Sequence, residues 1–76
     1  MDNQDKKVIL IEFGNTLRTI RLAKGFTQEQ LANELGVEIS QISRIERGII
    51  NTSMTTIYEI AKILKINISE LFEFNK

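Results

Sequence analysis

The sequence predicts an all-α fold of five helices in a single domain that spans residues 1–76. The chain contains no proline, and its apolar residues recur at intervals of three and four, which is the period of an amphipathic helix. Four glycines divide this pattern, and glycine just beyond a helix end adopts the left-handed conformation at little steric cost. A 76-residue chain is close to the lower limit for independent folding, so a partner subunit is one expected source of stability.

The residue types that are missing exclude most enzymes and metal sites. The chain has no cysteine and no histidine, so thiol and imidazole groups are not available for catalysis, disulfides or zinc binding. Its longest apolar run, Val8–Ile11, is far shorter than the roughly 20 residues of a membrane span. We therefore predict a cytoplasmic binding module that is not an enzyme, with no cofactor, no metal, no membrane contact and no evident small-molecule ligand.

The first predicted helix runs from about Ile9 to Lys24, with Phe13 and Leu17 on its apolar face. Its beginning is ambiguous, because residues 7–13 contain enough β-branched side chains to form a strand. Gly14 also disfavours a helix by about 1 kcal/mol relative to alanine. We favour one continuous helix, and a strand over these residues is the alternative.

The second helix begins at a capping box. Thr27 is the predicted N-cap, and Gln30 stands three residues later, where its side chain can reach back to the cap. Leu31 and Leu35 supply the apolar face, and Gly36 ends the helix.

The third helix is predicted over about residues 39–47, with Ile42 and Ile45 on its inner face. Its start signal is poor, because Glu38 occupies the position where serine, threonine or aspartate would cap the helix. A carboxylate still favours the positive end of the helix dipole, so the helix is weakened rather than excluded.

Two further caps delimit the remaining helices. Ser53 caps a fourth helix that extends to Leu64. Asn67 and Glu70 form another capping box, which starts a short fifth helix. The connections between helices are three to five residues long, as expected for a compact helical bundle.

Residues 27–48 form the most informative unit of the sequence. Two short helices joined by a tight turn that contains glycine are the helix-turn-helix arrangement. Ala32 provides the small residue for close approach of the helices, Gly36 lies in the turn, and the apolar Val37 follows it. The spacing therefore predicts a helix-turn-helix.

The residues of this unit also resemble those of a known family, the Cro/repressor-type (XRE) helix-turn-helix proteins. The similarity covers about residues 9–74. The segments that carry it are Thr-Gln-Glu-Gln-Leu-Ala at 27–32, Leu-Gly-Val at 35–37, Ile-Ser-Arg-Ile-Glu-Arg-Gly at 42–48, and the stretches 51–57, 60–64 and 69–72. The resemblance implies a five-helix, lambda repressor-like DNA-binding domain, usually dimeric on pseudo-palindromic DNA, with the third helix in the major groove.

The dimensions of the third helix agree with this implication. Nine residues form a helix about 13 Å long and about 10–12 Å across, and the major groove is about 12 Å wide. Arg44 is the sharpest candidate on the outer face, because a guanidinium can pair with both O6 and N7 of guanine. The candidate base-reading residues are Ile39, Ser40, Gln41, Ser43 and Arg44. The alternative for each is an ordinary solvated side chain.

A second set of residues is expected to contact DNA phosphates. Gln28 matches the family's phosphate-contacting glutamine, at a helix N-terminus whose amides already favour an anion. The candidate phosphate-binding residues are Thr27, Gln28, Arg47, Asn51 and Thr52. The alternative for them is solvation or helix capping.

Arg21 and Glu46 match a buried ion pair of the family, so the resemblance implies a structural role for both. Glu46 falls on the inner face of the third helix, where an unpaired carboxylate would be costly. We therefore do not count this pair among the DNA contacts.

The C-terminal segment is more apolar than a short last helix needs. We predict that it forms a two-fold dimer seam through Ile66, Ile68, Leu71, Phe72 and Phe74, and the alternative is that Leu71 and Phe72 only close the core. The family often has basic residues where this chain has Ile49 and Ile50. These two could pack under the fourth helix, join the dimer contact or approach DNA.

The sequence thus predicts a sequence-specific DNA-binding transcriptional regulator that acts as a homodimer on double-stranded DNA. An antitoxin-like protein that neutralises a partner protein is the alternative. The net charge is zero, and residues 26–51 carry two basic and four acidic residues, so the helix-turn-helix is not basic. We therefore expect fewer phosphate contacts, and a shallower salt dependence, than in a basic repressor.

Overall fold

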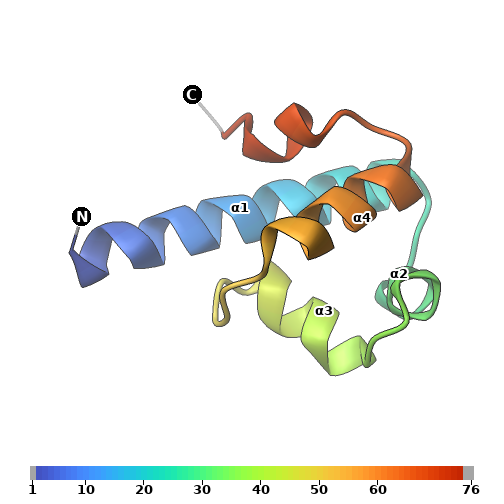
Figure 1. The fold of residues 1–76 in the computed structure, drawn as a ribbon, viewed down its shortest axis with the longest axis horizontal. Helices are drawn as coiled ribbons and strands as arrows, with labels where there is room; N and C mark the ends of the chain where they lie inside the picture. The colour runs from blue at the N-terminus through green and yellow to red at the C-terminus, as the bar shows by residue number, and fades with distance from the viewer. Residues whose placement is uncertain (1, 75–76) are drawn as a thin grey trace.

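The computed structural model describes residues 2–74, and every regular element within that range is helical. The elements are α1 (Asn3–Ala23), α2 (Gln28–Leu35), α3 (Ile39–Glu46), α4 (Met54–Leu64) and the 3-10 helix η1 (Ile68–Phe72). The predicted all-α class is confirmed (Figure 1). The fifth element differs from the prediction, because it is a short 3-10 helix and the α-helices number four across the described residues. A segment of five residues suits this tighter geometry.

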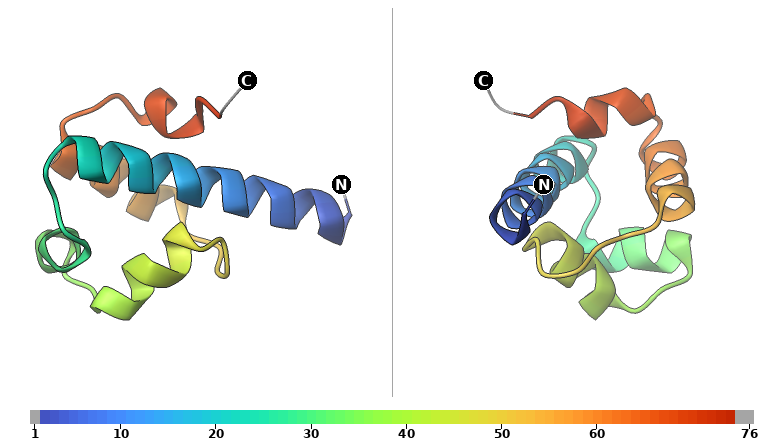
Figure 2. Two further views of the ribbon diagram at one scale, coloured as in Figure 1. Left: turned by 180° about the vertical axis from the view of Figure 1, so that it is seen from behind. Right: turned by 60° about the vertical axis from the view of Figure 1, so that its left-hand side comes forward.

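Helix α1 is the long axis around which the other elements pack. In Figures 1 and 2, η1 lies on one side of α1 and the α2–α3 pair lies on the opposite side. The helix begins at Asn3, six residues before the predicted start, because the Asp2 carboxylate caps it by accepting a hydrogen bond from the Asp5 amide at 3.0 Å. The alternative of a strand over residues 7–13 is therefore wrong. A strand there would have had no other strand to pair with among the described residues.

Gly14 lies inside α1 without breaking it. It is buried against the C-terminal end of α3, and a Cβ atom at this position would lie 2.4 Å from the carbonyl oxygen of Glu46 and 2.6 Å from that of Ile45. Real Cβ atoms do not approach backbone this closely, so only glycine allows α1 and α3 to meet here. The close approach offsets the low helix propensity of glycine.

The two helices of the predicted helix-turn-helix have the expected ends. The Thr27 hydroxyl accepts a hydrogen bond from the Gln30 amide at 3.0 Å, and the Gln30 side chain accepts one from the Thr27 amide at 2.9 Å. Gly36 ends α2 in the left-handed conformation with φ of 79°. Glu38, the N-cap of α3, makes no side-chain capping hydrogen bond, in agreement with the poor start signal predicted at this position. The predicted end of this helix at residue 47 is one residue late, because Arg47 is its C-cap.

The core lies between α1, the helix-turn-helix and α4, and η1 closes it. Seven large side chains are less than 2% exposed, namely Leu17, Leu31, Ile42, Ile45, Ile60, Leu64 and Leu71. Ile50 packs against this core, whereas Ile49 is 57% exposed. The two isoleucines of the α3–α4 loop therefore have different environments, and core packing accounts for only one of them.

Candidate nucleic-acid interface

Helix α3 has one face in the core and one face in solvent. Ile42 and Ile45 are at most 1% exposed and Glu46 is 5% exposed, which fixes the rotation of the helix about its axis. Ser40 and Arg44 lie on the opposite face and are exposed, and Ile39, in the first turn of the helix, is 48% exposed. Helix α3 therefore presents a cation and an apolar side chain to solvent within two turns.

The predicted base-reading residues differ in how exposed they are to solvent. Ile39, Ser40 and Arg44 are exposed, whereas Gln41 and Ser43 are half-buried at the two edges of the same face. Neither Ser40 nor Arg44 forms a side-chain hydrogen bond or ion pair within the described part of the chain. Three of the five candidates are therefore exposed on α3, and two are half-buried.

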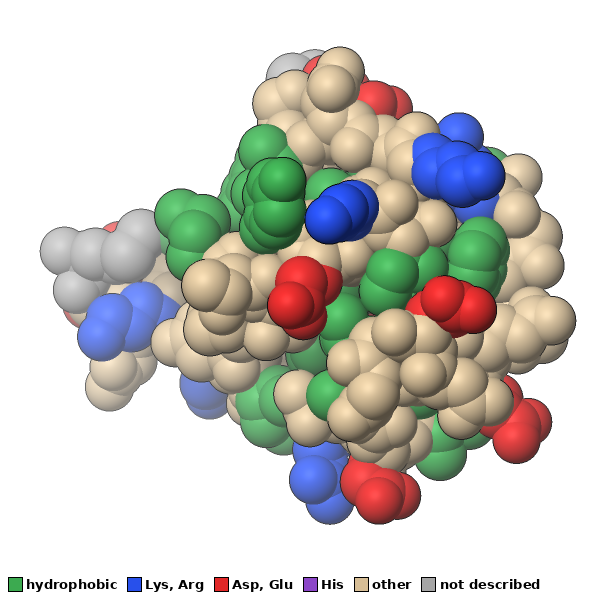
Figure 3. All heavy atoms as spheres, turned by 45° about the vertical axis from the view of Figure 1, so that its right-hand side comes forward, with side chains coloured by type: hydrophobic (Ala, Val, Ile, Leu, Met, Phe, Trp, Pro, Cys, Tyr) green, Lys and Arg blue, Asp and Glu red, His purple; other side chains and the backbone are tan. Residues whose placement is uncertain are grey.

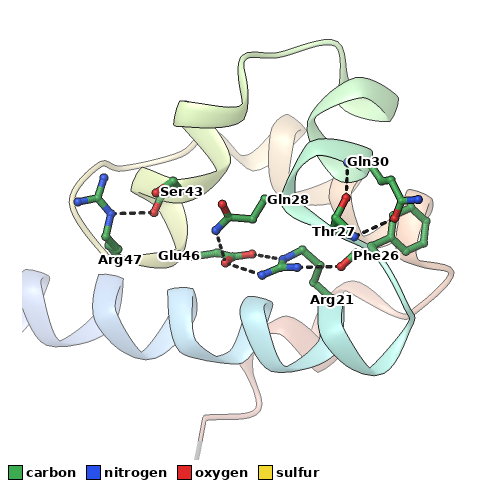
Figure 4. Close-up of polar contacts among 8 residues, drawn as sticks. All are labelled: Arg21, Phe26, Thr27, Gln28, Gln30, Ser43, Glu46 and Arg47. Carbon is green, nitrogen blue, oxygen red and sulfur yellow. Dashed lines mark hydrogen bonds and ion pairs between the residues drawn. The ribbon is translucent and has the colours of Figure 1, made fainter.

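Arg21 and Glu46 form the ion pair that the resemblance implies. Arg21 Nε lies 2.6 Å from Glu46 Oε2, and Arg21 Nη2 donates to Glu46 Oε1 at 3.1 Å (Figure 4). Arg21 Nη1 donates to the carbonyl oxygen of Phe26 at 2.8 Å. Among the described residues, no buried side-chain polar atom lacks a hydrogen-bond partner. The pair therefore joins α1, the α1–α2 loop and α3 with its donors and acceptors satisfied.

The start of α2 lies directly beside this ion pair. Gln28, half-buried, donates from Nε2 to Glu46 Oε1 at 3.0 Å. Thr27 is exposed, and its hydroxyl caps the helix. Sequence reasoning missed the Gln28–Glu46 bond, because eighteen residues separate the two positions and no local pattern relates them. The first amides of an α-helix have no acceptor within the helix, so this end of α2 is suited to an anion.

The remaining phosphate candidates lie on the connection between α3 and α4. Arg47 and Asn51 are exposed and Thr52 is half-buried. Arg47 Nε makes a long contact of 3.4 Å with the carbonyl oxygen of Ser43. Ser53 caps α4 by accepting a hydrogen bond from the Thr56 amide at 3.2 Å, so these residues precede a second helix N-terminus.

The predicted dimer seam needs one correction. Leu71 is 0% exposed and belongs to the core of its own chain, because η1 turns it inward, so it is not available to a partner subunit. Phe72 is 46% exposed, although its ring centroid lies 5.4 Å from that of Phe13. The other three predicted seam residues, Ile66, Ile68 and Phe74, are half-buried and pack against the core.

On the face shown in Figure 3, the charged side chains do not gather into one basic surface. Acidic and basic side chains alternate there with apolar and neutral ones. Residues 2–74 contain no cluster of three or more side chains that could hold a metal ion. No helix within the same range is long and apolar enough to cross a membrane.

Comparisons with known proteins identify relatives over most of the chain. A family model described as Helix-turn-helix (HTH_3) matches residues 17–71. The control protein C.BamHI of Bacillus amyloliquefaciens is 40% identical over 67 residues, which cover 87% of this chain and 83% of that protein. Antitoxin HipB of Escherichia coli O6:H1 (strain CFT073) is 31% identical over 58 residues, which cover 76% of this chain and 62% of that protein.

A solved structure with the same fold gives a similar result. The crystal structure of the restriction-modification controller protein C.AhdI from Aeromonas hydrophila matches with a TM-score of 0.80 and 43% sequence identity. The match covers 83% of this chain and 96% of that chain. Sequence and fold therefore lead to the same group of proteins.

Proposed function

This chain belongs to the XRE-type helix-turn-helix family of DNA-binding transcriptional regulators, and we propose that it binds a pseudo-palindromic DNA site as a homodimer. The observation that carries the proposal is the division of α3 into a buried face and an exposed face that bears Ser40 and Arg44, with Ile39 exposed in its first turn. The buried face fixes the helix, so the exposed face can read base edges with a constant geometry.

The side chains on that face match the chemistry of the major groove. Arg44 carries two parallel donors that fit the O6 and N7 acceptors of guanine. Ile39 offers an apolar surface to the methyl group of thymine, and Ser40 can donate to or accept from a base edge. Gln41 and Ser43, at the margins, are placed to read a flanking base or a phosphate. The proposed base specificity therefore rests mainly on Arg44.

Phosphate contacts would orient α3 in the groove. Thr27 and Gln28 at the start of α2 would bind one phosphate together with the backbone amides of the first turn. Arg47, Asn51 and Thr52 would bind the phosphates that flank the other end of α3. These contacts carry no sequence information, so their loss should weaken binding to all sites alike.

The low charge of the helix-turn-helix is compatible with this role. Glu46 is neutralised by Arg21 at 2.6 Å and is buried. Arg44 and Arg47, in contrast, are exposed together with Glu38 at the start of α3 and Glu29 at the start of α2. Binding should release few counterions, so the salt dependence should be shallow. Affinity would then depend strongly on two copies binding together.

We infer that two copies associate through the C-terminal segment. Phe72 is the most exposed apolar side chain of that segment, and Ile66, Ile68 and Phe74 flank it. This segment lies on the side of α1 opposite to α3, so pairing there leaves α3 uncovered (Figure 2). Two helix-turn-helix units joined in this way would reach successive major grooves, about 34 Å apart.

The relatives support a repressor or controller role that needs no catalytic step. C.BamHI and C.AhdI are both controller proteins by name, and both match most of this chain. Because such a role is exercised on DNA, we expect the protein in the cytoplasm. The similarity to antitoxin HipB favours a second candidate, in which the protein neutralises a partner protein. The exposed apolar side chains Ile49 and Phe72 would then contact that partner.

Selection of bound DNA from a random pool at two salt concentrations distinguishes the two functions. A DNA-binding regulator should enrich a two-fold symmetric site at both concentrations, with modest loss at the higher salt. Featureless binding, or none, would contradict the regulator and leave the protein-neutralising function as the better account.

A further inference from the structure

Glu46 on α3 accepts a hydrogen bond from Gln28 on α2, in addition to its ion pair with Arg21. Its side chain is 5% exposed, and Arg21 already holds both carboxylate oxygens, at 2.6 Å and 3.1 Å. That pairing alone neutralises the buried charge. Oε1 nevertheless accepts a further hydrogen bond, of 3.0 Å, from Gln28 Nε2 at the start of α2. The second bond therefore needs a reason other than charge neutralisation.

The bond determines which way the Gln28 amide faces. A carboxylate only accepts hydrogen bonds, so the NH2 end of the amide must point toward Glu46. Figure 4 shows the amide nitrogen directed at Glu46 and the amide oxygen directed away. The nitrogen carries two hydrogens, and Glu46 uses one of them. The other N–H remains a donor at the first turn of α2.

The same arrangement makes the approach of a phosphate electrostatically acceptable. A bare carboxylate beside the first turn of α2 would repel an anion. Here the Arg21 guanidinium neutralises Glu46, so a phosphate meets a neutral pair and an amide that can bridge to it. The backbone amides at the helix start add donors in the same place.

We propose that Glu46 is a positioning residue for DNA binding, which holds the Gln28 amide with its free N–H directed at the phosphate bound by α2. This inference rests on the DNA-binding function proposed above. Glu46 belongs to α3 and Gln28 to α2. The bond between them therefore sets the phosphate contact at a fixed place relative to the base-reading face.

A double-mutant cycle on DNA affinity tests the proposal. The wild type, Gln28→Ala, Glu46→Gln and the double variant are titrated against one duplex, the site that the wild type enriches from a random pool. Each single substitution should weaken binding about three- to tenfold, as for one lost hydrogen bond. The double variant should bind no more weakly than the weaker single variant. If the double variant loses affinity by the product of the two single factors, the proposal is wrong, because Glu46 then acts independently of Gln28.

Asn51→Ala is the matched control. Asn51 is exposed, is proposed to contact a phosphate, and forms no bond with Glu46. The factors by which Asn51→Ala and Glu46→Gln lower DNA affinity should therefore multiply in the double variant. All affinities are measured at a temperature at which circular dichroism shows each variant folded. If Glu46→Gln does not fold, Glu46→Asp replaces it in the cycle, because it keeps the negative charge beside Arg21 and withdraws the acceptor from Gln28 by one methylene group.

The outcomes separate this inference from the proposed function. If the wild type enriches no DNA site, both are wrong. If it enriches a site and the losses multiply, only the positioning role of Glu46 is wrong. A direct readout is the side-chain amide resonance of Gln28 in the DNA-free protein, which should move toward that of a solvated glutamine in Glu46→Gln. An unchanged resonance would also contradict the proposal.

Discussion

The two faces of α3 show how one helix serves stability and recognition with separate side chains. Ile42 is 0% exposed, whereas Arg44, two residues later, is exposed. The Glu46 side chain forms hydrogen bonds with two other elements, whereas the Arg44 side chain forms none with the described residues. The inner face therefore fixes where the helix sits, and the outer face is left free to determine what it binds.

This division predicts that substitutions on α3 separate into two kinds. A change on the inner face should lower the free energy of unfolding and affect DNA binding only as far as folding is lost. A change on the outer face should leave the free energy of unfolding nearly constant and alter binding.

Ile42→Ala should destabilise the protein by about 3 kcal/mol, because it removes a fully buried side chain and leaves a cavity. Chemical denaturation measures the change. Ile39→Ala is the matched control, with the same substitution at an exposed position in the first turn of the same helix. It should stay within about 0.5 kcal/mol of the wild type, since alanine also has the higher helix propensity. Equal losses in the two variants would refute the assigned rotation of α3.

Gly14→Ala should destabilise the protein by about 2 kcal/mol, despite the better helix propensity of alanine. The added methyl group would meet the carbonyl oxygens of Ile45 and Glu46 and push the end of α3 away from α1. Thermal unfolding compares it with Asn15→Ala, an exposed neighbour on the same helix. If Gly14→Ala were as stable as that control, the tight approach of α1 and α3 would be wrong.

Gln28→Ala should weaken binding to every DNA site by a similar factor, about three- to tenfold, because a phosphate contact carries no base information. Its apparent dissociation constants are measured on the selected site and on variants with single base changes. The ranking of those sites should match that of the wild type. A changed ranking would show that Gln28 reads a base.

Ile39→Ala should have the smallest effect, about 0.5 kcal/mol in DNA binding, because a half-exposed side chain loses only part of one methyl contact, and the effect should be confined to one base position in each half-site. Replacing thymine by uracil at that position removes the methyl group from the DNA instead. The two changes should not add, because each removes the same contact. Additive losses would place Ile39 away from the thymine methyl.

Local signals in the sequence predicted the helix ends well. The capping box of Thr27 and Gln30, the Ser53 cap and the left-handed Gly36 all depend on neighbours within a few residues, and the structure confirms them. The early start of α1 had a local signal as well, in Asp2, but the β-branched run that follows it pointed to a later start or a strand.

Features that depend on distant residues were not predictable from local patterns. The burial of Gly14 against α3 and the bond between Gln28 and Glu46 arise only when separate helices meet. Leu71 belonged to an apolar segment whose inner and outer residues could not be separated before the path of η1 was known. The Arg21–Glu46 pair was anticipated from the family resemblance, since nothing in the spacing of the two residues relates them.

Base reading by the outer face of α3 depends most on Arg44. DNA selection carried out in parallel with the wild type and Arg44→Ala tests this dependence. The wild type should enrich a two-fold symmetric site, and Arg44→Ala should lose the preference for guanine at one position in each half-site, a change of about 1–3 kcal/mol. The other positions should be retained. An unchanged selected site in Arg44→Ala would contradict the claim that the outer face of α3 reads the sequence.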